Sequence, residues 1–490
     1  MRSPEGIAIG VDVATAEVRA VAVDMATGAA LASARASLAP PVRSAGGKSE
    51  QRPDYADVTA SLVAAVCRDL SGSSADVRAI CVTGTSGTIV PCAEDGSPIG
   101  NARLYDDTSS LAVLSDRGMT NMSSLGRMVS LQADADTPLF LHTPDVVTWS
   151  LAGEPLPTDT SHALKAGVDQ ELAVWPEAEM TALGLDVHAV PALAYPGVIV
   201  GSVSDVMTQR LGLPSGVRIT SGMTDGCTAQ ISSGAIHLGD TMAVLGTTLV
   251  MKAVSAISIR THDGAVYSHR SPDGDYWAGG ASNAGAGVLA TEFAGRDLGA
   301  LDAAAAAHGP STVIRYPLSR AGERFPVADP DATGFSLGTP TDDVDAFRAV
   351  LEGVAFVERL GIETLTGLGI RPHRHSITGG ASRSAIWNRI RATVLAGSVN
   401  AAKGYGVVHV PHANSAHGAA LLATRGILGE RLSDTVDRLV PSADPVLPEP
   451  AESAVLNESY DRFRDHLMRS RPGASASTST STTDSHLSPR

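Results

Sequence analysis

The sequence ITSGMTDGCTAQISSGAIHLGDTMAVLGTTLVM, residues 219–251, contains the pattern that decides the fold. It holds two acidic residues. Asp240 stands at the entry to a strand and is interpreted as a solvated turn residue. Asp225 lies between Thr224 and Gly226 in a Gly-rich, almost uncharged segment. A carboxylate in such surroundings is a candidate general base, because it can take a proton from an attacking alcohol.

Two short apolar runs follow Asp225 and are joined by a turn of small residues. Residues 241–245 and 249–254 have strand character, and Gly246, Thr247 and Thr248 connect them. Backbone N–H groups and hydroxyls at the tip of such a hairpin can hold phosphate oxygens without a lysine. The combination predicts phosphoryl transfer. A Gly-rich core turn with an Asp cap explains the same residues, and this alternative stays open here.

Length and composition limit the classes of protein to consider. The chain has 490 residues, so two or more domains are expected. Its formal net charge of −15 argues against nucleic acid or an anionic membrane as a partner. The four cysteines are scattered, which argues against a zinc site or a disulfide framework. No apolar run approaches the ~20 residues of a spanning helix, so a cytoplasmic protein is expected.

The N-terminal segment repeats the plan of the central hairpin. Asp12 and Thr15 lie at the first tip of a predicted antiparallel meander with strands at 7–11, 18–23 and 29–36. We interpret this meander and the 241–254 hairpin as two copies of one unit, whose tips grip a polyphosphate from two sides. Because a carboxylate repels phosphate, Asp12 must act through a cation, for which Mg²⁺ is the best candidate. Alternatively, Asp12 merely ends a strand.

Two further segments place polar groups at strand ends. Thr85 and Ser86 follow a predicted strand at 77–82, and Asp107 follows soon after; these side chains suit a polyhydroxylated ligand, although an exposed turn explains them equally well. Gly379, Gly380 and Ala381 come between a short strand and a predicted helix, a common place for a nucleotide.

The remaining predictions concern organisation. Helices are expected at 139–153, 175–185 and 343–365, and a final packing helix at 416–425 in which Gly418 allows close approach. The triplet at 47–49 resembles a phosphate-binding loop, but Val42 stands where that motif needs glycine, so a loop is predicted. His409, His412 and His417 have no regular ligand spacing. Residues 471–490 are of low complexity and are predicted to be disordered.

Taken in order, these motifs resemble the FGGY carbohydrate kinases. The Asp12–Thr15 turn, GMTDG around Asp225, the GTT turn and TGGASRSAIWNRI carry the resemblance, which runs from about residue 6 to 469. It implies an α/β fold with two actin-like, ribonuclease-H-like ATPase domains and an ATP cleft between them. The expected domains are residues 1–238, with the sugar site, and 239–470, with the adenosine site; a tail of 471–490 follows.

The resemblance also implies roles for individual residues. Asp225 matches the general base, and Asp12, with Thr15 in the same loop, matches the metal-linked residue of the first phosphate loop. The second phosphate loop corresponds to Gly246, Thr247 and Thr248. The adenosine segment corresponds to Gly379, Gly380, Ala381 and Asn388. This chain departs from the pattern at Ala381, often glycine, and at Asn414 and Ser415, where an acidic residue is common.

The predicted reaction is phosphorylation of a pentulose at its terminal hydroxyl by ATP and Mg²⁺. Thr85, Ser86, Asp107 and Asp225 are the predicted sugar-binding residues. GTSG stands where xylulokinase-like members often have Gln-Met-His-Gly, which favours D-ribulose over D-xylulose. Another polyol or sugar kinase, an actin-like ATPase and a sugar-binding relative without kinase activity remain alternatives. A homodimer is left open.

Overall fold

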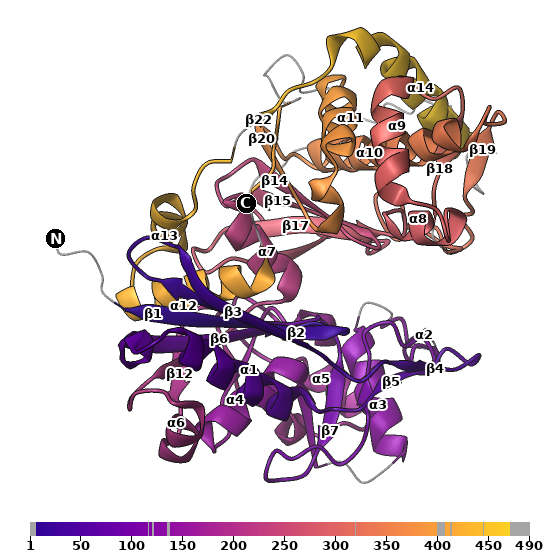
Figure 1. Cartoon of the computed structure of the whole chain (residues 1–490). Helices are drawn as coiled ribbons and strands as arrows, with labels where there is room; N and C mark the ends of the chain where they lie inside the picture. Colours follow the sequence, from indigo (N-terminus) through magenta and orange to yellow (C-terminus); the bar gives the residue numbers. More distant parts are fainter. Residues whose placement is uncertain are drawn as a thin grey trace, which may run out of the picture.

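The computed structural model shows two lobes joined along one side (Figure 1). It describes residues 6–115, 117–119, 122–134, 138–318, 320–398, 407–411, 414–443 and 445–470. His412 and the tail at 471–490, predicted to be disordered, lie outside the described residues. Each lobe is built around one mixed sheet, and helices cover both sheets.

The sheet of the first lobe contains the predicted N-terminal meander. β1 runs antiparallel to β2, β2 runs antiparallel to β3, and β1 runs parallel to β6. All seven residues of β1 are buried, as expected for a central strand. The strand order is β12 (Ile199–Ser202), β13 (Arg218–Thr220), β6 (Val77–Gly84), β1 (Ile7–Val13), β2 (Glu17–Asp24), β3 (Ala30–Ser37).

The sheet of the second lobe repeats this plan. β14 runs antiparallel to β15, β15 antiparallel to β17, and β14 parallel to β20, so the two hairpins interpreted as copies occupy equivalent places. The order is β16 (Tyr267–Arg270), β17 (Tyr276–Ser282), β15 (Leu249–Ser255), β14 (Asp240–Leu245), β20 (Arg374–Thr378), β21 (Val408–His409), β22 (Pro445–Val446).

Smaller sheets extend both lobes. The loop predicted at 47–49 is confirmed only in part, because Gly47 lies in a turn whereas Ser49 opens strand β5. The small sheets pair β4 (Val42–Arg43), β5 (Ser49–Gln51), β8 (Ala102–Arg103), β7 (Ile89–Cys92) and β9 (Leu139–His142); β10 (Thr158–Asp159) and β11 (Leu193–Ala194); and β18 (Ile314–Tyr316) and β19 (Phe335–Leu337).

Helices connect the strands and cover the sheets. In the described residues they are α1 (Tyr55–Asp69), α2 (Ala112–Ser115), α3 (Ser123–Asp134), α4 (Thr143–Ala152), α5 (Glu177–Ala182), α6 (Asp205–Leu211), α7 (Asp225–Ser233), α8 (Gly287–Glu292), α9 (Leu298–His308), α10 (Asp343–Gly367), α11 (Ala385–Ala396), α12 (Ser415–Leu428), α13 (Leu432–Leu439) and α14 (Pro450–Arg469).

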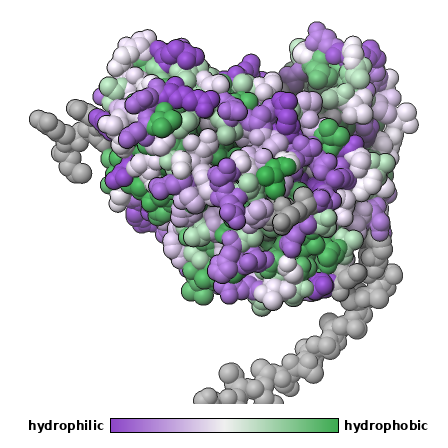
Figure 2. All heavy atoms as spheres, turned by 90° about the horizontal axis from the view of Figure 1, so that it is seen from below, coloured by the Kyte–Doolittle hydropathy of each residue, from purple (hydrophilic) through white to green (hydrophobic). Residues whose placement is uncertain are grey.

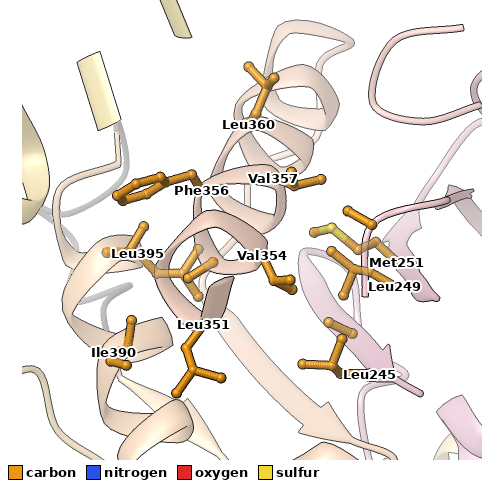
Figure 3. Close-up of a cluster of buried hydrophobic side chains, with 14 of the residues drawn as sticks. Leu245, Leu249, Met251, Leu351, Val354, Phe356, Val357, Leu360, Ile390 and Leu395 are labelled. Atoms are coloured by element: carbon orange, nitrogen blue, oxygen red, sulfur yellow. The ribbon is translucent and has the colours of Figure 1, made fainter. Parts of the chain in front are cut away.

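Helix α10 forms the centre of the second lobe and confirms the prediction at 343–365. The carboxylate of Asp342 caps it by accepting hydrogen bonds from the amides of Val344 and Asp345. Figure 3 shows α10 between the hairpin strands on one side and α11 on the other. The buried contacts include Leu245, Leu249, Met251, Leu351, Val354, Val357 and Leu395.

Four local predictions were wrong. Residues 139–153 form strand β9 followed by α4, because Pro144 fits the first turn of a helix and His142 caps it. The helix predicted at 175–185 is α5, which spans only Glu177–Ala182. Asp240 is buried, and its carboxylate accepts a hydrogen bond from the His237 amide. The helix predicted as the last one, α12, is followed by α13 and α14.

The face seen from below carries hydrophilic side chains around scattered hydrophobic ones (Figure 2). The exposed large hydrophobic residues are spread along the chain, as is usual for protein surfaces. Among the described residues, no helix is both long enough and apolar enough to cross a bilayer. The homodimer therefore remains a prediction without an assigned interface.

Helices α7 and α12 cross between the two sheets, and glycines make the crossing possible. A Cβ atom on Gly418 would lie 1.8 Å from the carbonyl oxygen of Thr228 in α7. A Cβ atom on Gly10 would lie 1.8 Å from the carbonyl oxygen of Ala416 in α12. Helix α12 packs on β1 and β6 of the first lobe, whereas α7 packs on β14 and β20 of the second. Each helix therefore packs on the sheet of the opposite half of the chain.

This crossing predicts a strong effect of one methyl group. Gly418→Ala should lower the free energy of unfolding by at least about 1–3 kcal/mol, because the backbones must separate to admit the Cβ. The matched control is Gly367→Ala at the end of α10, where no atom lies within 4 Å of the new Cβ. That change should leave stability unchanged or raise it by up to about 1 kcal/mol. Urea unfolding followed by circular dichroism measures both; equal midpoints would contradict the proposed role of the crossing.

Candidate active site

Asp12 lies near the end of β1 and is almost completely buried, with 1% of its surface exposed. Its Oδ2 lies 3.4 Å from Nη1 of Arg19, the residue opposite it on β2. Its Oδ1 is buried and has no hydrogen-bond partner in the described part of the chain. Burial raises the pKa of Asp12 to about 7, and repulsion from Asp225 adds to this rise. The carboxylate is thus held where a further positive group would stabilise it.

Asp225 is the first residue of α7 and lies at the same edge of the sheet as Asp12. Strand pairing explains this: Val13 pairs with Gly84, and Gly84 forms a parallel bridge with Thr224. The Gly226 amide donates a hydrogen bond to Asp225 Oδ1 at 2.6 Å. Burial raises the pKa of Asp225, while the hydrogen bond from Gly226 and nearby positive side chains oppose the rise. A carboxylate with a raised pKa is suited to accept a proton.

The two hairpin turns differ in exposure. Thr247 is exposed at the tip between β14 and β15, and the Gly246 amide donates to the carbonyl of Thr248. Gly285 and Gly287 lie under this tip, because a Cβ on either would come within 3 Å of Thr247 atoms. In the first turn Thr15 is half-buried, and its carbonyl accepts a hydrogen bond from Gln51.

The predicted adenosine segment lies beside the second hairpin. Gly379 follows β20 with φ of +95°, and a Cβ there would lie 2.5 Å from the carbonyl oxygen of Leu245. Gly380 is exposed and opens a short 3-10 turn before α11. Ala381 is half-buried in the same turn. Asn388 donates to the carbonyl of Ser382 at 2.7 Å, and its Oδ1 is buried with no partner among the residues described.

A cavity of about 790 Å³ lies between the lobes. First-lobe residues 105–108, Arg127 and Lys165 line one side, and second-lobe residues including Tyr267 and Arg324 line the other. A site in this position suits a ligand that both lobes enclose.

The predicted sugar-binding residues do not all reach this cavity. Asp107 lines it, but its carboxylate already accepts hydrogen bonds from Ser49, Ser109 and Ser110 and lies 3.5 Å from Arg103. Thr85, Ser86 and Asp225 are not among the lining residues, although Lys165, which lies within electrostatic range of Asp225, is one of them. The carbonyl oxygen of Ser86 accepts a hydrogen bond from Nζ of Lys165, a lining residue, at 3.2 Å.

Sequence reasoning missed several charged groups around Asp225. In the segment 158–169, Asp159 Oδ2 and His162 Nδ1 are 2.6 Å apart, and His162 Nε2 lies 3.1 Å from the carbonyl of Gly84. Burial lowers the pKa of His162, but the Asp159 carboxylate outweighs burial and raises it to about 9. The Asp-x-x-His spacing of Asp159 and His162 was the sequence signal that could have revealed this pair. Burial, followed by repulsion from Arg127, lowers the pKa of Lys165 to about 8.

The carboxylate of Asp12 fits a magnesium ion that is bound together with phosphate. In the described residues, no group of three or more His, Cys, Asp or Glu side chains is placed to hold a metal ion. Mg²⁺ needs no such cage, because it usually binds one or two carboxylates, water and substrate phosphates. The unpartnered Oδ1 of Asp12 supplies an oxygen ligand of that kind.

Comparison with known proteins confirms the resemblance and the fold. Residues 241–427 match the C-terminal domain of the FGGY family of carbohydrate kinases. A xylulose kinase from Staphylococcus epidermidis is 24% identical over 279 residues, 55% of each chain, so the chain matches about half the length of that relative. Crystal structures of a xylulose kinase and a gluconate kinase from Lactobacillus acidophilus superpose with TM-scores of 0.82 at 19% identity. They cover 95% and 94% of this chain and 99% and 98% of theirs. The fold is that of the two-domain actin-like ATPases.

Proposed function

We propose that this protein is an ATP-dependent kinase that phosphorylates the terminal hydroxyl of a pentulose. The observation that carries the proposal is the position of Asp225, a carboxylate of raised pKa at the sheet edge that also bears Asp12. The family match at 241–427 and the relatives named xylulose kinase support the reaction class.

The chain's own residues divide the work of binding ATP. The turns at Thr15 and at Gly246–Thr248 receive the phosphates through amides and hydroxyls. Gly379, Gly380, Ala381 and Asn388 receive the adenosine. Mg²⁺ would be held by Asp12 and would neutralise phosphate charge. The sugar occupies the cavity between the lobes, and Asp225 accepts the proton of its terminal hydroxyl during attack on the γ-phosphorus. Positioning and charge neutralisation account for most of the rate enhancement in this class of reaction.

Removing the Asp225 carboxylate should abolish most of the activity. Asp225→Asn keeps the size of the side chain but cannot accept the proton, so kcat should fall at least ~10²-fold while ATP and sugar still bind. The matched control is Asp205→Asn, because Asp205 is the exposed first residue of α6. Steady-state kinetics compare the two variants. A near-normal kcat for Asp225→Asn would refute the role of general base.

A side chain at Gly380 should interfere with nucleotide alone. The free protein has room for it, because the nearest heavy atom to a Cβ there is Arg383 Nη2 at 3.9 Å. Gly380→Val should therefore fold normally and raise the KM for ATP far more than the KM for the sugar. Gly100→Val, at another exposed glycine whose Cβ would meet nothing closer than 3.5 Å, is the control. Equal effects on both KM values would argue against adenosine binding at Gly380.

Two pentuloses, D-ribulose and D-xylulose, are candidates for the proposed substrate. The GTSG segment favours D-ribulose, whereas the curated relatives are named xylulose kinases. We predict a higher kcat/KM for D-ribulose than for D-xylulose, and negligible turnover of glycerol, because a pocket that pairs hydroxyls rejects ligands that leave its polar groups unpaired. A coupled assay of ADP release under saturating MgATP compares the three. If glycerol or a hexose were the best substrate, the pentulose assignment would be wrong.

A further inference from the structure

Lys252 is a lysine whose side chain is largely buried. It lies on β15 with 6% of its surface exposed. Every other buried lysine or arginine in the described residues donates to a carboxylate or a carbonyl: Arg103, Arg127, Arg348, Arg359 and Arg391. Within those same residues Lys252 makes no hydrogen bond or ion pair. The ammonium nitrogen of Lys252 is not among the fully buried polar atoms that lack a partner, so the stem is buried while the ammonium stays accessible to solvent or to a ligand.

The side chain of Lys252 points toward the first lobe. Leu249, Met251 and Ala253 alternate with it along β15 and face the core of the second lobe. Lys252 therefore faces the opposite side, as does Val254, which packs in the interlobe cluster that includes Cys227 of α7. Its stem passes directly under the first turn of α7, because a Cβ on Gly226 would lie 3.4 Å from Lys252 Cε.

Positively charged side chains from several elements lie near Asp225. Lys252, Lys165 and His162 are all within electrostatic range of its carboxylate. His162 is already paired with Asp159, whereas the hydrogen bond that Lys165 donates within the described residues goes to the Ser86 carbonyl. His269, close to both lysines, stays neutral, because burial and the lysines lower its pKa. The carboxylates of Asp12 and Asp225 oppose the charges of the two lysines, but within the described residues neither lysine forms a direct ion pair, so both can meet an anion beside Asp225.

We propose that Lys252 binds the phosphoryl group that is transferred, with its ammonium on the non-bridging oxygens. This inference rests on the proposed kinase function. The sugar hydroxyl oxygen forms a bond to the γ-phosphorus as its proton passes to Asp225, and the bond to the β-phosphate oxygen breaks, with its electron pair leaving on ADP. Lys252 takes no part in this proton transfer. Its charge stabilises the negative charge spread over the transferring group, which is where fixed positive groups contribute most.

The first experiment replaces Lys252 by Met in the full chain, which removes the charge and keeps an unbranched stem. We expect kcat to fall about 10²–10³-fold, the scale for removal of one stabilising donor, with little change in the KM for the sugar. Arg218→Met, at an exposed position of β13, removes one charge as the control. A kcat within a few-fold of the parent, or a rise confined to the KM for the sugar, would overturn the proposal.

Calorimetry gives a second readout that needs no turnover. The non-hydrolysable methylene analogue of ATP and ADP are titrated into the parent and into Lys252→Met. The ratio of the affinity for the analogue to the affinity for ADP should be about tenfold smaller in Lys252→Met than in the parent, because only the analogue carries the γ-phosphate. An unchanged preference together with a shifted pH–rate profile would instead assign Lys252 to a structural ion pair with Asp225. If the parent phosphorylates none of the sugars, the proposed function fails, while the titration still decides for Lys252.

A third variant covers the case in which Lys252→Met does not fold. Lys252→Ala leaves a channel the length of the missing stem, and propylammonium supplies the lost atoms and charge. Restored kcat with propylammonium, but not with 1-propanol, would support the proposal. Absence of rescue in a folded, nucleotide-binding Lys252→Ala would overturn it.

Discussion

The structure depends on the close contact of α12 with β1 and α7. Two backbones can approach this closely only where no Cβ separates them, and Gly10 and Gly418 meet that condition. The contact has a direct consequence for chemistry. The hydroxyl of Ser415, the first residue of α12, donates to the carbonyl of Asp225 at 3.1 Å. Because α12 also packs on the strand that carries Asp12, one helix fixes both acidic residues of the candidate site.

Electrostatic pairing separates the structural charges from the candidate functional ones. Glu358 is buried in the second lobe, but Arg391 and His375 satisfy both of its oxygens and lower its pKa to about 2 despite burial. Asp12 and Lys252 are also largely buried, with 1% and 6% of their surfaces exposed, yet among the described residues Asp12 has a carboxylate oxygen without a hydrogen bond and Lys252 has no hydrogen bond or ion pair. A buried oxygen without a partner is costly, so the free Oδ1 of Asp12 indicates a ligand that completes it, and the accessible ammonium of Lys252, which also lies near Asp225, can meet the same ligand.

Much of the fold was predictable because its signals are local. Helix α10 and both hairpins follow from apolar periodicity and from capping or turn residues within the same segment. The failures come from influences that periodicity does not capture. Residues 139–153 have apolar residues on both sides of the polar stretch at 142–145, so Pro144 was the signal that distinguished a strand followed by a helix. Lys252 escaped notice because a single lysine in a strand usually reaches solvent. Its enclosure depends on α7, which belongs to the other half of the chain.

The duplicated hairpins carry opposite charge, and this difference bears on how ATP can be held. The first hairpin carries Asp12, which the proposed function places next to the phosphates, whereas the second offers a neutral turn with Lys252 on the strand that leaves it. Phosphate facing the first lobe therefore needs an added cation, while phosphate facing the second meets fixed positive charge. An anion bound between the lobes would be attracted from both sides only with the metal present. A dependence on Mg²⁺ is thus expected from the negative charge of the first lobe alone. The second lobe contributes the positive charge of Lys252, which is part of the protein and not a bound ion.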